Sequence, residues 1–342
     1  MTVRSIPRRS IYTGFRAYIK TVGTGERGRR PLTREEAHDA TRMILAGEAT
    51  DVQSAAFLTA MRIKGENPEE LAGMADALRE RATPLTARTD RTLVACAGGY
   101  DGCVDAPSLS LAAGVVAAAA GAGVVIHCGT TLGPKYGVTP ADVLGVLGGP
   151  ARPTGPESEA MLERTGVTVV HVAELLAGWQ SVATIRDEVG LRSPIHSAEK
   201  LVDWFGAKRF IVGYAHSQYA ARLCGALDLL GAERSYAVRG PEGSDIMRPG
   251  RPSAHLNGEK MDLPESVGDN LAPAPGAEAA AAMTRAVVDG SADRIVASTV
   301  TLSAGLRLHA CGVAPTVLAG VAASRAAIAD GRAAATLDAL TV

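Results

Sequence analysis

The chain has 342 residues, of which 46% are hydrophobic and 21% are charged, and its formal net charge at pH 7 is −1. These values are typical of a soluble globular protein with one large or two modest domains. The longest apolar stretch, 109–129, is rich in Ala and Gly and is divided at Gly121, so we expect no membrane span. The basic N-terminus lacks the continuous apolar core of a secretory signal. We therefore expect a cytoplasmic protein.

The cysteines are odd in number and widely spaced along the chain. They are Cys96, Cys103, Cys128, Cys224 and Cys311. This pattern is atypical of a disulfide framework and fits reduced thiols. A zinc site is disfavoured as well, because no CxxC pair is present.

Charge is unevenly distributed along the chain. Residues 1–30 carry eight basic residues and one acidic residue, whereas acidic residues outnumber basic ones in the remainder. Such a segment is either a solvated basic terminus or an arm that contacts phosphate or nucleic acid. Aromatic residues make up only 4% of the chain, so platforms for stacking bases are sparse.

The N-terminal part predicts a small bundle of three helices. Thr33 and Glu36 have the spacing of a capping box, and Gly47 marks the end of that helix. A second helix follows up to Gly65, and a third begins at Asn67, whose side chain is a typical helix cap.

Beyond residue 88 the pattern alternates between strands and helices. Strands are predicted at 92–98, 123–129, 167–172, 208–214 and 234–240, with helices at 108–121, 139–148, 173–190 and 217–231. A hairpin is expected at 253–263, and helices fill the C-terminal part. We therefore predict an α/β fold: a small N-terminal helical bundle domain plus a larger α/β domain with a mostly parallel central sheet flanked by helices. The domains are expected at 1–88, joined by helices from about 174–205, and at 89–342.

The predicted strand 92–98 runs into a glycine-rich loop. Gly98, Gly99 and Gly102 allow a phosphate to approach backbone amides, and Ser108 and Ser110 lie at the start of the next helix. Neither a P-loop nor a GxGxxG pattern is present, so a plain strand-to-helix turn is the alternative.

A second loop of this kind follows the strand 123–129. It contains His127, Thr130, Thr131 and Lys135. The lysine suits a phosphate as a point charge. His127 is either a hydrogen-bond donor to a substrate or a satisfied structural residue.

The order of these segments resembles the anthranilate phosphoribosyltransferase family (glycosyltransferase family 3), which in turn resembles the pyrimidine nucleoside phosphorylases in fold. The most specific part is "MRIKGENPEELAGM", and the resemblance extends from about residue 10 to "GRAAATLDAL". It implies binding of phosphoribosyl pyrophosphate through a GTGGD loop, an N-x-S-T helix start and a KHGNR segment, with Mg²⁺ held by an Asp-Glu pair.

The chain keeps part of the first two family motifs. Gly98 and Gly99 fall on the GTGGD loop, while Tyr100 stands at its acidic position unless Asp101 takes that role. Ser110 keeps the magnesium-ligand serine of the second motif. The resemblance thus implies a phosphate loop with an altered acidic position.

The third motif has changed more. His127 keeps the KHGNR histidine, but Thr130 and Thr131 replace its Asn-Arg, and Ser108 replaces the Asn of the second motif. Lys135 is a candidate to replace the missing positive charge.

The acceptor and metal positions have also changed. Arg192 keeps the arginine that contacts the aromatic acid in the family, whereas His196 stands where Asn is usual. Asp245 keeps one magnesium carboxylate, and Glu242 is a possible second. Three residues are predicted to position the acceptor, namely His127, Arg192 and His196.

Three hypotheses follow. The first is a homodimeric transferase that moves a phosphoribosyl group from phosphoribosyl pyrophosphate to a small-molecule acceptor, aromatic or an amine, other than anthranilate. The second is a non-catalytic family member that binds DNA as a dimer, because the departures resemble a second branch of the family with nucleic-acid-binding members. The third is phosphorolysis of a nucleoside, which needs no magnesium.

Overall fold

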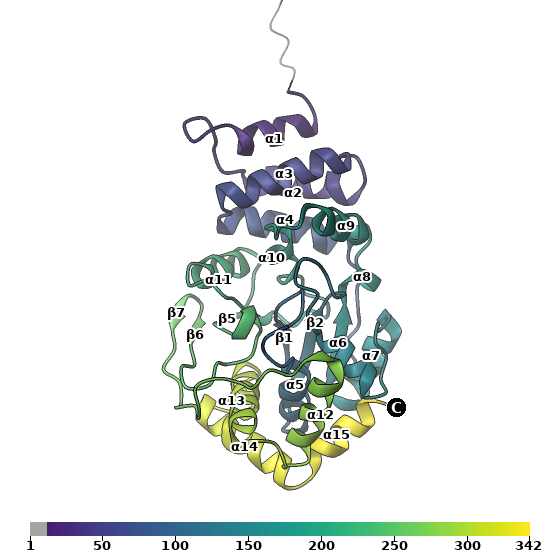
Figure 1. The fold of residues 1–342 in the computed structure, drawn as a ribbon, viewed down its shortest axis with the longest axis vertical. Coiled ribbons are helices and arrows are strands. Elements are labelled where there is room, and N and C mark those ends of the chain that lie inside the picture. The colour runs from purple at the N-terminus through teal and green to yellow at the C-terminus, as the bar shows by residue number, and fades with distance from the viewer. Residues whose placement is uncertain (1–11) are drawn as a thin grey trace, which may run out of the picture.

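The computed structural model describes residues 12–342 and begins with a bundle of four helices (Figure 1). They are α1 (Phe15–Gly23), α2 (Arg34–Leu45), α3 (Asp51–Lys64) and α4 (Pro68–Arg81). The three predicted helices are α2 to α4, and the capping boxes at Thr33 and Asn67 are both formed. Helix α1 was not predicted, because no side chain caps its start at Gly14. It packs on α3 through Phe15 and Phe57, whose ring centroids lie 5.4 Å apart.

The larger part is built on one seven-stranded sheet with the order β3-β2-β1-β4-β5-β6-β7. The strands are β1 (Leu93–Ala97), β2 (Gly123–Cys128), β3 (Val167–His171), β4 (Arg209–Gly213), β5 (Arg234–Val238), β6 (Ala254–Leu256) and β7 (Glu259–Lys260). The first five are parallel, while β6 and β7 form the predicted antiparallel hairpin. The expected α/β fold with a mostly parallel sheet is confirmed.

The sheet reverses its strand order between β1 and β4, which pair in parallel but lead to opposite edges. Ligands of open α/β sheets typically bind at such a switch point, at the carboxyl ends of the strands. The glycine-rich loop starts there, directly after Ala97.

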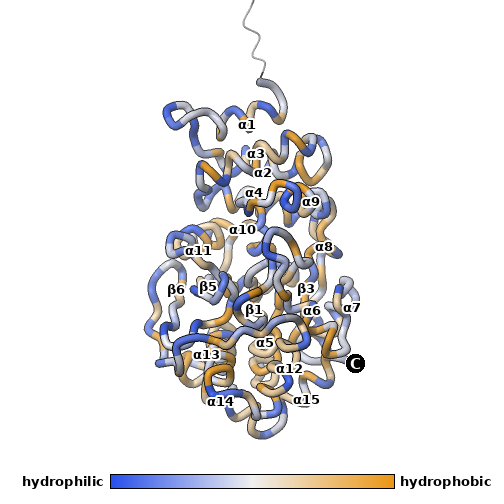
Figure 2. The backbone as a smooth tube through the Cα atoms, in the orientation of Figure 1, coloured by the Kyte–Doolittle hydropathy of each residue, from blue (hydrophilic) through white to orange (hydrophobic). Residues whose placement is uncertain are grey.

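Helices cover both faces of the sheet (Figure 1). They are α5 (Ser110–Ala119), α6 (Pro140–Val146), α7 (Gly155–Thr165), α8 (Val172–Leu175), α9 (Trp179–Val189), α10 (Ile195–Glu199), α11 (Tyr219–Leu229), the 3₁₀ turn η1 (Pro241–Gly243), α12 (Gly276–Val288), α13 (Arg294–Ala310), α14 (Val317–Ala329) and α15 (Arg332–Leu340). One core contains α5, packed against α12 to α15, and Figure 2 shows α5 hydrophobic along its length. The other core joins the remaining sheet face to the helical bundle.

The region 173–190 differs from the single helix that was predicted. Helix α8 ends at Leu175, because Leu176 is extended, and Gly178 with a left-handed φ of 89° precedes the start of α9. Helix α9 then packs on α2 and α3, while α10 and α11 pack on α4. Helix α7 was not predicted, whereas α10 lies within the region 174–205 in which helices were expected. Within residues 12–342, none of the helices combines the length and the apolar character needed to cross a bilayer.

Candidate functional site

The glycine-rich loop after β1 lies against the segment after β5. A Cβ atom at Gly98 would lie 2.9 Å from Oδ1 of Asp245 and 3.2 Å from its backbone nitrogen, so the loop approaches this closely only because residue 98 is glycine. The cleft at this contact, which we call the glycine-loop cleft, is lined among others by Gly98, Gly99, Ser108, Ser110, His127 and Asp245. Six of the predicted site residues therefore meet here.

Asp245 is completely buried in this cleft with two partners. The hydroxyl of Ser110 donates a hydrogen bond to its Oδ1 over 2.5 Å, and the guanidinium of Arg307 forms an ion pair with its Oδ2. Arg307 is itself fully buried, so it neutralises a carboxylate that would otherwise be costly to bury. Sequence reasoning missed Arg307. The signal was present as an arginine within the mostly apolar run "LSAGLRLHA" of α13.

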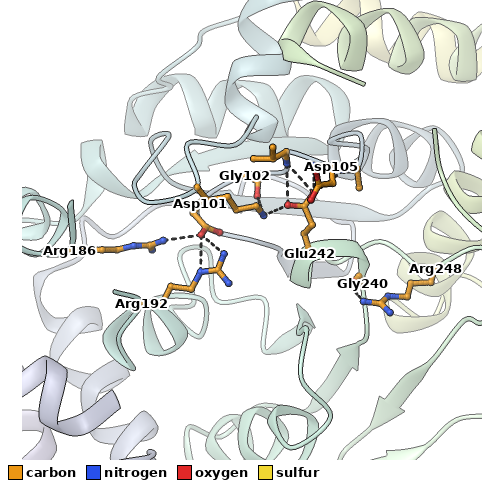
Figure 3. Close-up of polar contacts among 11 residues, drawn as sticks. Asp101, Gly102, Asp105, Arg186, Arg192, Gly240, Glu242 and Arg248 are labelled. Carbon is orange, nitrogen blue, oxygen red and sulfur yellow. Dashed lines mark hydrogen bonds and ion pairs between the residues drawn. The ribbon is translucent and has the colours of Figure 1, made fainter. Parts of the chain in front are cut away.

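Asp101 fastens the same loop to α9 and to the segment that follows α9 (Figure 3). Its Oδ2 lies 2.9 Å from a guanidinium nitrogen of Arg186 and 2.9 Å from one of Arg192. Arg186 also lies over the ring of Tyr100, 4.8 Å from the ring centroid. Arg192, predicted to contact the acceptor, is thus engaged in holding the loop, and Arg186 was missed.

Glu242, which Figure 3 labels, forms a second ion pair with Lys135 at the other end of the loop. Their Nζ and Oε2 atoms are 2.6 Å apart. Glu242 also accepts hydrogen bonds from the backbone amides of residues 104–106. Burial alone would raise the pKa of Glu242, but the bonds from Lys135 and these amides outweigh it and hold the pKa below its usual value. Neither side chain lines the glycine-loop cleft.

His127 has partners on both ring nitrogens. Its Nε2 lies 2.6 Å from Oε1 of Glu199, and the indole N–H of Trp204 donates to its Nδ1 over 3.3 Å. Because Nδ1 accepts, the proton lies on Nε2 and is donated to the carboxylate. His127 therefore orients Glu199, a residue that sequence reasoning missed.

His196 is buried beneath a second cavity, which we call the aromatic cavity. Its Nδ1 lies 3.1 Å from the hydroxyl of Ser193, and its ring centroid is 5.2 Å from that of Tyr100 and 5.3 Å from that of Trp179. Burial first, and the charge of Arg186 second, hold the pKa of His196 well below its usual value. Thr130 and Thr131 line this cavity rather than the glycine-loop cleft.

A third cavity lies between the helical bundle and the sheet. Tyr100, Asp101, Arg192 and Lys200 belong to its lining, and Tyr100 also lines the aromatic cavity. Lys200 is buried and donates to the carbonyl of Gly213. Burial lowers the pKa of Lys200 to about 8. Its lining position was not anticipated from the sequence.

The predicted metal residues are only partly brought together. Ser110 and Asp245 are in contact, whereas Glu242 is occupied by Lys135 and backbone amides. Within residues 12–342 no group of three or more His, Cys, Asp or Glu side chains forms a metal centre. Any bound metal would need ligand atoms from a substrate.

Two family descriptions match the chain in tandem. Residues 16–82 match the helical bundle domain of a glycosyl transferase family, and residues 95–334 match its a/b domain. The chain belongs to this glycosyl transferase family. The family resemblance expected from the motifs is confirmed.

Relatives of this glycosyl transferase extend over most of its length. Anthranilate phosphoribosyltransferase from Geobacillus stearothermophilus is 32% identical over 309 residues, which cover 87% of this chain and 90% of the relative. Anthranilate phosphoribosyltransferase 2 from Streptomyces coelicolor is 32% identical over 321 residues, covering 90% and 94%. These relatives are pentosyltransferases by class, so the expectation of an enzyme of this class is confirmed.

Solved structures agree with the fold. Anthranilate phosphoribosyltransferase from Thermus thermophilus superposes with a TM-score of 0.81 at 31% identity, covering 91% of this chain and 95% of that one. The Saccharomyces cerevisiae enzyme, solved in complex with PRPP and Mg, gives a TM-score of 0.81 at 17% identity, with 96% of each chain covered. At that identity the second likeness concerns the fold alone.

Proposed function

We propose that this glycosyl transferase moves a phosphoribosyl group from phosphoribosyl pyrophosphate to a small-molecule acceptor other than anthranilate. The bond between ribose C1 and the pyrophosphate oxygen breaks, and pyrophosphate leaves with the electron pair. A lone pair of the acceptor forms the new bond to C1, and the acceptor loses its proton to water. Stabilising the charge of the leaving group is the larger catalytic task in such a reaction.

The glycine-loop cleft is the observation that carries this proposal. Gly98 and Gly99 leave backbone accessible at the carboxyl end of β1, next to the hydroxyls of Ser108 and Ser110. Backbone amides and hydroxyls beside a glycine-rich turn are typical partners of phosphate. The relative solved with PRPP and Mg has the same fold, which supports a phosphorylated sugar as the donor.

Magnesium fits this cleft only together with the donor. Ser110 and Asp245 offer two oxygen ligands, and Mg²⁺ is commonly bound by one or two carboxylates plus substrate phosphates. Ser110 and Asp245 would hold the ion, which when bound neutralises charge on the departing pyrophosphate. Glu242 is not included, because it does not line this cleft and its carboxylate is turned to Lys135 and three amides.

Calorimetric titration of the purified protein tests the proposal. Phosphoribosyl pyrophosphate with Mg²⁺ should give a binding heat, and Mg²⁺ alone should give none. The absence of heat with both together would overturn the proposed donor. Titration with inorganic phosphate and a nucleoside distinguishes phosphorolysis, since only that reaction needs both.

DNA binding is the second candidate, and one surface favours it. Arg239, Arg248, Arg251 and Lys260 line a wide groove around the η1 turn and the β6–β7 hairpin, with Asp105 and Asp269 among the acidic residues there. The first eleven residues of the basic N-terminal arm lie outside the described residues. Single- and double-stranded DNA should bind with a steep dependence on salt if this candidate holds, and no complex at low salt would exclude it. The homodimer and the cytoplasmic location stay predictions.

A further inference from the structure

The aromatic cavity has a volume of about 280 Å³ and lies beside the glycine-rich loop. Tyr100 of that loop, residues 129–132 after β2 and side chains of α8 and α9 form its walls. It is therefore next to the cleft in which we place the donor, and large enough for a ring compound.

The charges around this cavity are all of one sign. Asp187, Glu188 and Glu199 line it, and none of the described residues in its lining is Lys or Arg. Arg186 lies behind this lining, 4.8 Å from the centroid of the Tyr100 ring, and it shares the carboxylate of Asp101 with Arg192. An anion in the cavity would meet three carboxylates in the lining and no lining cation to balance them.

Glu199 is the buried member of this group. His127 donates to Oε1, whereas Oε2 is buried and has no hydrogen-bond partner in the described part of the chain. A buried carboxylate oxygen without a partner is costly, and a ligand N–H would remove that cost. The indole of Trp204 holds the imidazole of His127, and His127 in turn holds the carboxylate of Glu199. The direction of Oε2 is therefore fixed before a ligand binds.

The other walls are aromatic. The His196 ring lies within stacking distance of both other rings, with its centroid 5.2 Å from that of Tyr100 and 5.3 Å from that of Trp179. Nε2 of His196 is likewise buried without a partner among residues 12–342. Flat rings gain by packing on such walls, and aromatic faces also attract cations.

We infer that the aromatic cavity takes a flat aromatic amine or nitrogen heterocycle that presents N–H groups, neutral or cationic, and that it rejects aromatic carboxylates. This inference rests on the proposed function for the statement that the bound compound is the acceptor. One N–H pairs with Oε2 of Glu199, and the ring packs on the aromatic walls to which Trp179 and Tyr100 belong. The carboxylate of an aminobenzoate would instead be placed near Glu199 and be repelled.

Two probes of similar shape and opposite charge test this selectivity. Benzamidine is a flat aromatic cation with N–H donors, and 2-aminobenzoate is a flat aromatic anion. Calorimetric titration of the full chain should show benzamidine binding at least tenfold tighter than 2-aminobenzoate. Equal binding of the two, or tighter binding of 2-aminobenzoate, would overturn the inference.

Variants locate the effect in the cavity. Glu199→Gln should weaken benzamidine binding at least tenfold, because the amide loses the negative charge. If this variant fails to fold without the His127 contact, Asp187→Asn serves instead, because Asp187 is exposed. This substitution should still lower the affinity for benzamidine severalfold. Glu163→Gln, on the exposed face of α7, is the matched control and should leave binding unchanged. Unchanged binding in Asp187→Asn and Glu199→Gln alike would contradict the inference.

Titration with phosphoribosyl pyrophosphate and Mg²⁺ in parallel separates the two claims. Donor binding without benzamidine binding overturns the acceptor class and leaves the proposed function standing. Benzamidine binding without donor binding overturns the proposed function and leaves the selectivity of the cavity standing.

Discussion

Glu242 and Lys135 form an ion pair 2.6 Å long beside the loop that follows β1, and the carboxylate also accepts from three consecutive backbone amides, those of Val104, Asp105 and Ala106. Consecutive amides next to a lysine are the usual components of an anion site. The protein therefore fills this site with its own carboxylate. Glu242 reaches it with a left-handed φ of 51°, a conformation that is uncommon outside glycine.

Glu242→Gln should free this site for an external anion. The amide cannot neutralise Lys135, so inorganic pyrophosphate should bind several times more tightly than to the unmodified protein. The free energy of unfolding should fall by about 1–3 kcal/mol, because charged hydrogen bonds are lost. Calorimetry and urea unfolding measure the two effects, with Glu163→Gln as the control. Weaker pyrophosphate binding would mean that Glu242 supports the anion site instead of occupying it.

Gly98→Ala should damage the glycine-loop cleft. The new methyl group would lie 2.9 Å from the carboxylate of Asp245 and 3.2 Å from its backbone nitrogen, so the loop must move away. We expect loss of donor binding and a destabilisation of about 1–3 kcal/mol, as is typical of overpacking. Gly25→Ala is the matched control, because nothing lies within 4 Å of its Cβ position. Donor binding that survives in Gly98→Ala would mean that the loop is only a turn.

Arg307→Met should be more destabilising than the double variant that also carries Asp245→Asn. The single change leaves a buried carboxylate without its cation, which costs about 3–5 kcal/mol. The double change removes both charges and should recover part of that loss. Urea unfolding of the unmodified protein, the two single variants and the double variant gives the four free energies of a double-mutant cycle. Strictly additive losses would show that the two charges do not stabilise each other.

Lys200 should make stability depend on pH in the alkaline range. Its pKa is about 8 in the folded chain, and the pKa of an unfolded lysine is near 10.5. Between pH 8 and 10.5 the lysine is mostly protonated in the unfolded chain and mostly neutral in the folded chain. Because the unfolded chain binds more protons, the free energy of unfolding rises as the pH increases through this range. The total is about 3 kcal/mol. Subtracting the pH profile of Lys200→Met isolates this contribution, and parallel profiles would contradict it.

Local signals in the sequence predicted much of the fold. Thr33, Asn67 and Thr139 cap their helices through residues three positions away, so the pattern is visible in a short window. Alternating apolar segments likewise predicted the parallel strands. Helix α1 has no capping side chain, and a single glycine such as Gly178 is often tolerated inside a helix. Neither feature therefore had a comparable signal in the sequence.

The site was predictable only in part, because its decisive contacts join distant residues. Asp101 and Arg186 are separated by 85 positions, and Asp245 and Arg307 by 62. The family motifs indicated Gly98, Ser110 and Asp245 individually. Which carboxylate would be neutralised by which cation depends on the tertiary fold, and no short segment records it.

Tyr100 belongs to the walls of both the aromatic cavity and the cavity beside Lys200. Its neighbour Asp101 is anchored by two arginines, so the backbone that carries the ring has little room to shift. The side chain of Tyr100 is thus a wall that the two cavities share. A bulky occupant on one side that displaces this ring moves a wall of the other cavity as well, so the two occupants are linked through a single side chain.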